Sequence, residues 1–296
     1  MMFRRFLIAA LALMLSLPGL CQENPSRAVR DSLLFEGRYR THYLYMPSRL
    51  REGRPLVLML HGYGGKADGY RPEMLEVAER EGFALCIPQG LKAPQGKTGW
   101  YVGYPKQKGM RQNDDEFVCY LSRYLCETYH LDNSFLVGMS NGGEMCYLIG
   151  RKYPGAFRAI ASVAGLTMLW ISEHVASHGP VPFMEVHGTM DRTSRWEGDL
   201  ENEGGWGAYI PVPEAVQFWV RENGCLPEES TTQLPLKADS SHPVILHSWT
   251  GEPAWEGGPE SEVRLYEVQG GKHSWALADM DTCDIVWEFF CKYLKK

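Results

Sequence analysis

The stretch Gly138-Met-Ser-Asn-Gly142 carries the strongest indication of the fold. An apolar run, residues 134–137, precedes it, and a run compatible with a helix, residues 144–153, follows it. A strand, a sharp turn between small residues and a helix are the context of a nucleophile elbow, whose strained serine lifts its hydroxyl out of a sheet. Larger side chains beside the serine would collide with the neighbouring strand or helix. The stretch therefore predicts an α/β fold with Ser140 as a nucleophile.

Short apolar runs alternate with helical patterns on both sides of this stretch. Runs typical of buried strands cover residues 56–60, 83–87, 135–137, 160–163, 183–186 and 263–268, and an alternating, half-exposed strand is expected over residues 39–45. Helices are expected over residues 73–80, 114–129, 213–223 and 282–294. Buried strands that alternate with helices predict a mostly parallel central sheet with helices on both faces.

Two stretches, residues 192–209 and 225–261, do not follow this alternation. Both are rich in Gly, Glu, Pro and Trp. We interpret them as long insertions over the top of the sheet, and not as a second domain.

The chain begins with the pattern of a secretory signal peptide. Arg4 and Arg5 precede an apolar run, residues 6–17, which is too short to span a bilayer comfortably. Cleavage before Gln22 would remove residues 1–21 and leave a single catalytic domain, residues 22–296, that is secreted or periplasmic. Lipidation of Cys21 fits less well because Leu20 is a poor match to that signal. A retained N-terminal anchor is the remaining alternative.

Charge and cysteine content narrow the classes of partner and cofactor. The 296-residue chain has a net charge of −6, which argues against nucleic acid or an anionic membrane as partner. Cysteines other than Cys21 are odd in number, so at least one thiol stays free. Cys119 and Cys126 would lie about 10 Å apart along a helix, too far for a disulfide, and Cys283 and Cys291 are spaced similarly. No cysteine pair has metal-ligand spacing, so we predict no metal and no cofactor.

A serine nucleophile needs a general base, and His273 is the strongest candidate. It follows the last predicted strand, within Gly270-Gly-Lys-His-Ser-Trp275, where paired glycines allow a loop to return the imidazole to the elbow. The orienting acid should leave a strand between serine and histidine, and Asp191 does so at the end of residues 183–191. Asp199 is the competitor, whereas acids after His273 are in the wrong order.

The developing oxyanion requires backbone N–H donors. One is expected from Asn141, the residue after the nucleophile. The other is expected from the loop His61-Gly-Tyr-Gly-Gly65, which follows the predicted strand 56–60. Tyr63 is the first choice for this second donor and Gly64 the alternative, while His61 is expected to brace the loop.

With these motifs, the chain resembles the secreted feruloyl esterase and polyhydroxybutyrate depolymerase group of α/β-hydrolases. The shared motifs are His61-Gly-Tyr-Gly-Gly65, Gly99-Trp100 with Asp114-Asp-Glu-Phe117, Gly138-Met-Ser-Asn-Gly-Gly143, His187-Gly-Thr-Met-Asp191, Phe218-Trp219 with Asn223-Gly-Cys225, and Gly270-Gly-Lys-His-Ser-Trp275. Ser-Asn-Gly-Gly and Gly-Gly-x-His-x-Trp are more specific than the bare elbow. The resemblance implies an α/β-hydrolase fold and carboxylic ester hydrolysis, with Ser140, Asp191 and His273 as the triad.

The chain departs from this group at two positions. Relatives often pair the cysteine that matches Cys225 with one before the last strand, but here that segment carries Trp255 and no cysteine. Relatives also tend to have proline after the residue that matches Trp275, and here it is Ala276. The disulfide and the course of the loop after His273 are therefore open.

The function expected from these residues is an exported esterase that releases feruloyl or acetyl groups from plant cell-wall polysaccharide through an acyl-enzyme. Trp100 and Trp275 adjoin shared motifs and are the candidate substrate contacts, although loop tryptophans also serve to pin loops to a sheet. A polyhydroxyalkanoate depolymerase, a general short-chain esterase and a peptidase are alternatives. From another class, a non-catalytic carbohydrate-binding protein on the same scaffold remains, although the chain retains all three triad residues.

Overall fold

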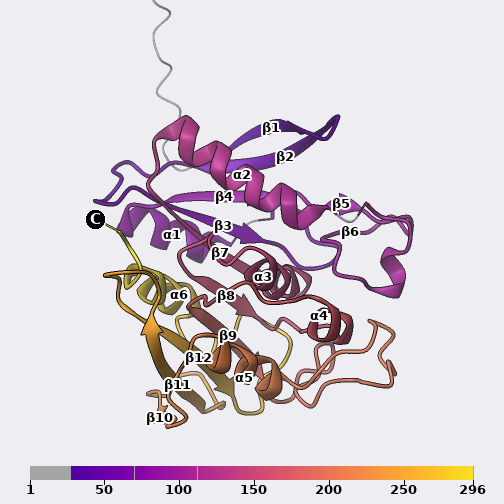
Figure 1. The fold of residues 1–296 in the computed structure, drawn as a ribbon, viewed down its shortest axis with the longest axis vertical. Coiled ribbons are helices and arrows are strands. Elements are labelled where there is room, and N and C mark those ends of the chain that lie inside the picture. The colour runs from indigo at the N-terminus through magenta and orange to yellow at the C-terminus, as the bar shows by residue number, and fades with distance from the viewer. Residues whose placement is uncertain (1–27, 70, 112, 296) are drawn as a thin grey trace, which may run out of the picture.

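A ten-stranded sheet forms the centre of the computed structural model, which describes residues 28–69, 71–111 and 113–295 (Figure 1). In spatial order its strands are β1 (Val29–Phe35), β2 (Arg38–Tyr45), β4 (Ala84–Pro88), β3 (Pro55–Leu60), β7 (Asn133–Met139), β8 (Ile160–Val163), β9 (Phe183–Gly188), β12 (Glu260–Val268), β11 (Val244–Pro253) and β10 (Ser230–Gln233). Neighbours from β4 to β12 pair in parallel, and the outer strands pair antiparallel. Strands β5 (Leu91–Lys92) and β6 (Thr98–Gly99) form a separate two-stranded ribbon. The predicted mostly parallel central sheet is confirmed.

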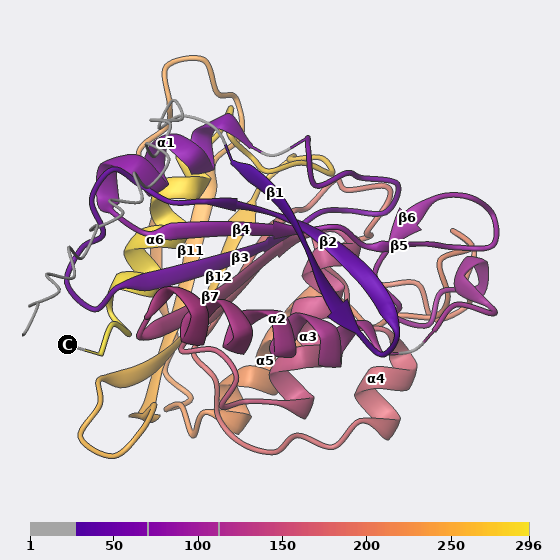
Figure 2. The ribbon, with the colours of Figure 1, turned by 90° about the horizontal axis from the view of Figure 1, so that it is seen from above.

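Helices cover both faces of the sheet, as predicted (Figure 2). Helices α1 (Pro72–Glu81) and α6 (Thr282–Cys291) lie on one face, and α2 (Asp114–Tyr129), α3 (Asn141–Lys152) and α5 (Val212–Glu222) lie on the other. A short helix, α4 (Leu169–His174), and a 3-10 turn, η1 (Pro105–Gln107), lie in the connecting segments. The predicted signal peptide, residues 1–21, lies outside the described residues.

Strand β3 shows why the sheet is buried on both faces. Its six residues are all buried. Leu58 packs in the cluster that contains residues of α2, α3 and α5, whereas Val57 and Met59 pack in the cluster that contains residues of α1 and α6. Side chains of a strand alternate between faces, so one continuous apolar run supplies both cores.

The structure corrects the interpretation of residues 225–261. This segment does not lie over the sheet: its strands β10 and β11 extend the sheet edge beside β12. All four residues of β10 are exposed, and β11 is mostly half-buried. Strands with so few buried side chains need no apolar run, so their sequence gives little sign of them. Helix α4 was not predicted either, because its six residues are too few for a helical pattern.

The sheet brings the candidate residues to one edge. Ser140 follows β7, Asp191 follows β9 and His273 follows β12, with a few residues between strand and side chain in the last two cases. These strands run in parallel, so their carboxyl ends meet at the same edge. The loop that starts at His61 leaves β3 at this edge as well.

Candidate active site

Ser140 occupies a strained turn between β7 and α3. Its backbone has φ 55° and ψ −122°, a conformation that residues with a Cβ rarely adopt. Its N–H donates to the carbonyl oxygen of Val163 at 2.8 Å, which ties the turn to the end of β8. The serine thus stands at the N-terminus of α3, where unpaired N–H groups favour negative charge.

The glycines of this turn are required by close backbone contacts. A Cβ at Gly138 would lie 2.2 Å from the carbonyl oxygen of Gly142, and a Cβ at Gly142 would lie 2.4 Å from that of Leu60. Both separations are far below van der Waals contact. The collision expected from the sequence is therefore the reason for glycine on both sides of Ser140.

Asp191 and His273 form a hydrogen-bonded pair. The Nδ1 of His273 lies 2.6 Å from Oδ2 of Asp191, and the carboxylate is buried. The other oxygen, Oδ1, accepts from the backbone N–H groups of Thr193 at 2.7 Å and Ser194 at 2.9 Å. The carboxylate is thus fixed with one oxygen directed at the imidazole. The competitor Asp199 instead accepts from the backbone N–H groups of its own loop, at Glu203 and Gly204.

A second acid–imidazole pair, which the sequence analysis missed, lies behind Asp191. Nδ1 of His187 lies 2.9 Å from Oε1 of Glu185. Nε2 of the same ring lies 2.8 Å from the carbonyl oxygen of Ser194 and 3.7 Å from Oδ2 of Asp191. Burial lowers the pKa of His187, but the hydrogen bonds with Glu185 and Ser194 and the charges of Glu185 and Asp191 together outweigh burial and raise the pKa overall. A protonated His187 places a positive charge beside the Asp191 carboxylate. In the sequence, the sign of this pair is that Glu185 and His187 stand at alternate positions of an otherwise apolar strand.

Ser140 and His273 line two cavities that share Thr193. The crevice at Ser140 has a volume of about 10 Å³ and is also lined by Tyr63, Tyr104, Glu144, Leu166, Thr193, Ser194 and Trp206. The cavity at His273 has a volume of about 390 Å³ and is also lined by Met190, Arg192, Thr193 and Lys272. Among the described residues, no hydrogen bond joins Ser140 to His273. The structure therefore brings Asp191 to His273 and places Ser140 in the adjoining crevice.

The loop after β3 lies against the serine. A Cβ at Gly62 would lie 3.3 Å from the Cβ of Ser140. The N–H of Gly64 donates to the carbonyl oxygen of Thr98 at 2.7 Å, so it is already engaged. The N–H of Tyr63 has no hydrogen-bond partner in the described part of the chain. This difference favours Tyr63 over Gly64 as the oxyanion donor.

His61 holds the same loop in place. Its Nε2 accepts from the N–H of Gly90 at 3.0 Å, and its Nδ1 lies 2.8 Å from the carbonyl oxygen of Gly62. Burial lowers the pKa of His61, which favours the neutral ring that these two contacts require. The contacts support the expected bracing role.

Trp100 is fully buried and contacts the elbow through hydrogen bonds. Its Nε1 donates to the carbonyl oxygen of His61 at 2.9 Å. Its backbone N–H donates to Oδ1 of Asn141 at 2.7 Å, and its carbonyl oxygen accepts from Nδ2 of Asn141 at 3.0 Å. In this structure the Trp100 ring is inaccessible to a substrate, and its contacts connect the loop after β3 to the first residue of α3.

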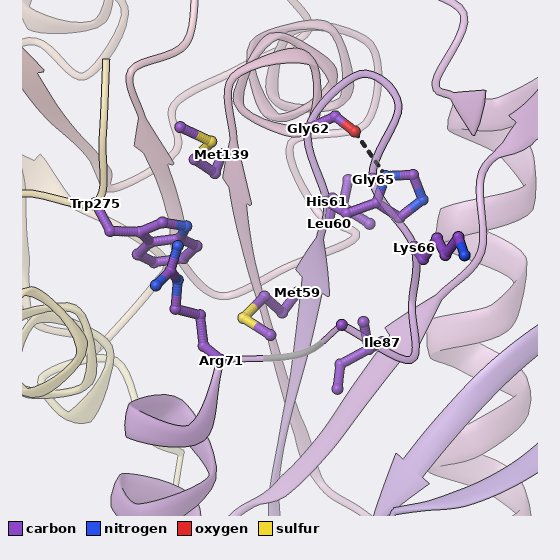
Figure 3. Close-up of a pocket in the computed structure, with 11 residues that line it drawn as sticks. Met59, Leu60, His61, Gly62, Gly65, Lys66, Arg71, Ile87, Met139 and Trp275 are labelled. Carbon is purple, nitrogen blue, oxygen red and sulfur yellow. Dashed lines mark hydrogen bonds between the residues drawn. The ribbon is translucent and has the colours of Figure 1, made fainter. Parts of the chain in front are cut away.

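Trp275 lines a separate cavity beside the site (Figure 3). This cavity has a volume of about 210 Å³, and Met59, Ile87 and Met139 form much of its apolar lining. The guanidinium of Arg71 lies 5.5 Å from the centroid of the Trp275 ring. Met139 directly precedes Ser140, so this cavity adjoins the elbow, and His61, Gly62 and Gly65 of the loop after β3 line it as well.

Glu144 is a buried carboxyl group in the crevice at Ser140. Only 1% of the residue is exposed, and its Oε2 has no hydrogen-bond partner among the described residues. Burial raises the pKa of Glu144 to about 8, although hydrogen bonds with Tyr104 and Asn141 act in the opposite direction. The group is therefore largely neutral at pH 7 and able to donate a hydrogen bond.

Other features bear on the chemistry and location of the chain. Within the described ranges, no three His, Cys, Asp or Glu side chains are grouped so as to hold a metal ion. None of the described helices combines the length and the apolar character that crossing a membrane requires. The seven described cysteines, including Cys225, are all free.

The fold and the site together define the class of protein. An acetyl xylan esterase from Aspergillus awamori has a similar structure, with a TM-score of 0.58 at 16% identity, over 86% of this chain and 94% of that one. The sheet order, the strained serine at the strand–helix turn and this likeness define an α/β-hydrolase.

Sequence comparison then gives the family. Residues 40–197, more than half of the chain, match the family described as esterase PHB depolymerase. The chain therefore belongs to the esterase PHB depolymerase family and is a carboxylic ester hydrolase.

Individual relatives agree with this assignment. The putative esterase NocK of Nocardia uniformis is 29% identical over 80% of this chain and 70% of its own length. An acetylxylan esterase of Coprinopsis cinerea is 26% identical over 84% of this chain and 68% of its own length. A feruloyl esterase B of Neurospora crassa is 27% identical over 42% of this chain and 43% of its own length.

Proposed function

We propose that this chain is an exported serine esterase that removes acyl groups, acetyl before feruloyl, from plant cell-wall polysaccharide. The strained turn that holds Ser140 beside the N-terminus of α3 carries the proposal. Similarity to an acetylxylan esterase and to a feruloyl esterase supports the substrate class.

In the proposed mechanism, Ser140 Oγ attacks the ester carbonyl while Nε2 of His273 accepts its proton. Asp191 keeps the other ring nitrogen, Nδ1, protonated and stabilises the imidazolium that forms. The N–H groups of Tyr63 and Asn141 bind the oxyanion. His273 then donates the proton to the leaving alcohol, the carbonyl re-forms as an acyl-serine, and water activated by His273 hydrolyses it.

A productive hydrogen bond between Ser140 and His273 belongs to the substrate complex in this mechanism. Catalytic hydrogen bonds are often long without substrate and tighten when it binds. Thr193 lines both the crevice at Ser140 and the cavity at His273. An ester bound against Thr193 would therefore contact both Ser140 and His273.

The size of the crevice at Ser140 favours an acetyl group over a feruloyl group. Its volume of about 10 Å³ corresponds to about one water-sized group. Tyr63, Tyr104 and Trp206 pack edge-on or tilted against one another along this crevice, with ring centroids 5.3–5.8 Å apart. A feruloyl group would have to displace this aromatic cluster.

The experiment compares release of acetate from acetylated xylo-oligosaccharides with hydrolysis of methyl ferulate and of a hydroxybutyrate oligomer. Ser140→Ala should abolish turnover of every ester that the wild type cleaves. Ser134→Ala is the matched control, because Ser134 is the second residue of the same strand and its hydroxyl donates to the carbonyl oxygen of Ala156. Activity that survives in Ser140→Ala would refute the nucleophile. A folded wild type that cleaves no ester but binds xylo-oligosaccharides would instead be a binding protein.

Export is part of the proposal and has its own test. Expression of the full chain in a bacterium with a secretion pathway should yield a processed protein whose N-terminal residue is Gln22. A processed protein that retains a lipid on Cys21, or an unprocessed chain in the cytoplasm, would contradict it.

A further inference from the structure

We propose that the alcohol portion of the substrate is a carboxylate-bearing sugar, such as a uronic acid residue of an acidic polysaccharide, bound in the cavity at His273. This inference rests on the proposed serine esterase function. It concerns the alcohol portion of the ester, which the elbow and the proposed triad do not specify.

The cavity at His273 is positioned for the alcohol portion of the ester. In acyl transfer by serine, the imidazole returns the proton to the leaving alkoxide, so the alcohol must lie beside the ring. His273 lines the cavity of about 390 Å³, whereas Ser140 lines the crevice of about 10 Å³. The crevice has room only for a methyl-sized end of an acyl group, and of these two cavities only the larger accommodates a sugar ring.

The charged residues of this cavity are cations. Arg192 and Lys272 line it together with Met190, Thr193 and His273, and no carboxylate of the described residues lines it. Arg192 and Lys272 are both exposed, and neither forms an ion pair with any described residue. Two unpaired cations that line one cavity make it a site for an anion of matching spacing.

The neighbouring cavity repeats this pattern. Lys66 and Arg71 line the cavity that contains Trp275, and among the described residues no carboxylate lines it (Figure 3). Arg71 extends toward the Trp275 ring, two residues after His273 in the chain (Figure 3). Arginines and lysines thus gather around the candidate site although the chain as a whole has a net charge of −6. A protein with this charge draws an anionic substrate only where cations are concentrated.

The carboxylates that belong to the site form no ion pair with Arg192 or Lys272. Asp191 is buried and pairs with His273, and Glu185, which is also buried, pairs with His187 behind it. Glu144, with a pKa of about 8, is largely neutral at pH 7. The positive charges of Arg192 and Lys272 are therefore available to a substrate carboxylate.

The test uses one acetylated oligogalacturonide in two forms, with free carboxylates and with its carboxyl groups methyl-esterified. Acetate release gives kcat/KM for each form, and p-nitrophenyl acetate serves as a neutral reference ester. We expect the wild type to prefer the acidic form by roughly five- to tenfold, because each solvent-exposed charge contact contributes only modestly. Since exposed charges are screened by salt, the preference should fall toward unity at about 0.5 M NaCl.

Variants that remove two positive charges test whether Arg192 and Lys272 cause the preference for the acidic form. Arg192→Gln/Lys272→Gln should lose the preference, and because the readout is a ratio, a general loss of activity cancels. Arg49→Gln/Lys295→Gln is the matched control, because both side chains are exposed and lie at the other end of the sheet. Their position follows from their neighbours: Arg49 lies beside Gly82, and Lys295 lies beside Gly53. This control should retain the preference.

Three results would overturn the inference. Equal kcat/KM values for the two forms in the wild type, or a preference that survives in Arg192→Gln/Lys272→Gln, would refute the acidic sugar while leaving the esterase intact. If the wild type failed to hydrolyse p-nitrophenyl acetate as well, the proposed serine esterase function would fail first and the inference with it.

Discussion

Asp191 and Asp199 are chemically identical, but they have different hydrogen-bond partners. Asp191 directs one oxygen at His273, whereas Asp199 accepts only from the backbone of its own loop. Asp191→Asn would place an amide beside the imidazole and favour the wrong tautomer, so we expect kcat/KM for p-nitrophenyl acetate to fall by about 10³–10⁴. Asp199→Asn should change it only a few-fold while lowering stability. Equal losses in the two variants would contradict the assignment of Asp191.

Glu144 makes the stability of the protein depend on pH. Burial raises its pKa in the folded state from 4.5 to about 8, so the folded protein retains a proton that the unfolded chain releases. Wild-type stability should therefore decrease as pH rises from about 4.5 to about 8, and this contribution should level off above that range.

The Glu144→Gln variant lacks this titration. Relative to the wild type, its free energy of unfolding should increase between pH 5 and pH 8, by an amount on the order of a few kcal/mol. Urea unfolding at pH 5, 6.5 and 8 measures the difference, and Glu76→Gln, at an exposed position of α1, is the control. A constant difference across this range would show that Glu144 is ionised throughout.

At the residue scale, sequence reasoning identified the residues that sit in motifs. Ser140, Asp191 and His273 each follow a strand within a short pattern, so they could be named before the fold was known. Glu185 and Glu144 could not, because nothing in a sequence states which carboxyl groups the fold will bury. Trp100 adjoins a shared motif, but only the packing shows that its ring is inaccessible.

At the element scale, the turn from β7 to α3 depends on glycine at position 142. Gly142→Ala would force a Cβ to within 2.4 Å of the Leu60 carbonyl oxygen, so β3 and α3 would have to separate. We expect a loss of about 3 kcal/mol in the free energy of unfolding. Gly155→Ala is the matched control, because a Cβ there meets nothing within 4 Å and should leave stability nearly unchanged. Equal stabilities of the two variants would show that the elbow can relax.

The elements that could be predicted are those that carry buried apolar side chains. Strand β8 and helix α2 begin and end where their patterns predicted, because all of β8 and one face of α2 are buried. Strands β10 and β11 add hydrogen bonds to the sheet edge but bury little, so their sequence retains no clear alternation. Their pairing follows from the free edge of β12, which is a property of the fold.

At the scale of the whole molecule, one sheet supports both hydrophobic clusters. Alternate residues of the same strands, such as Leu58 and Met59 of β3, belong to opposite clusters. Neither cluster can unfold without removing the support of the other, so residues 22–296 should melt as one domain. Calorimetry and tryptophan fluorescence should report a single coincident transition. An early, separate transition would show that part of the chain, such as the β10–β11 edge, is an independent unit.

All seven cysteines of the described residues are free, so the fold of these residues does not depend on disulfide formation. Burial raises the pKa of every one of these thiols, to about 11 for Cys126, Cys225 and Cys291 and to about 12 for Cys119 and Cys283. Thiolates, which attack oxidants and disulfides, are therefore scarce at neutral pH. We therefore expect the native fold to be the same in a reducing and in an oxidising medium.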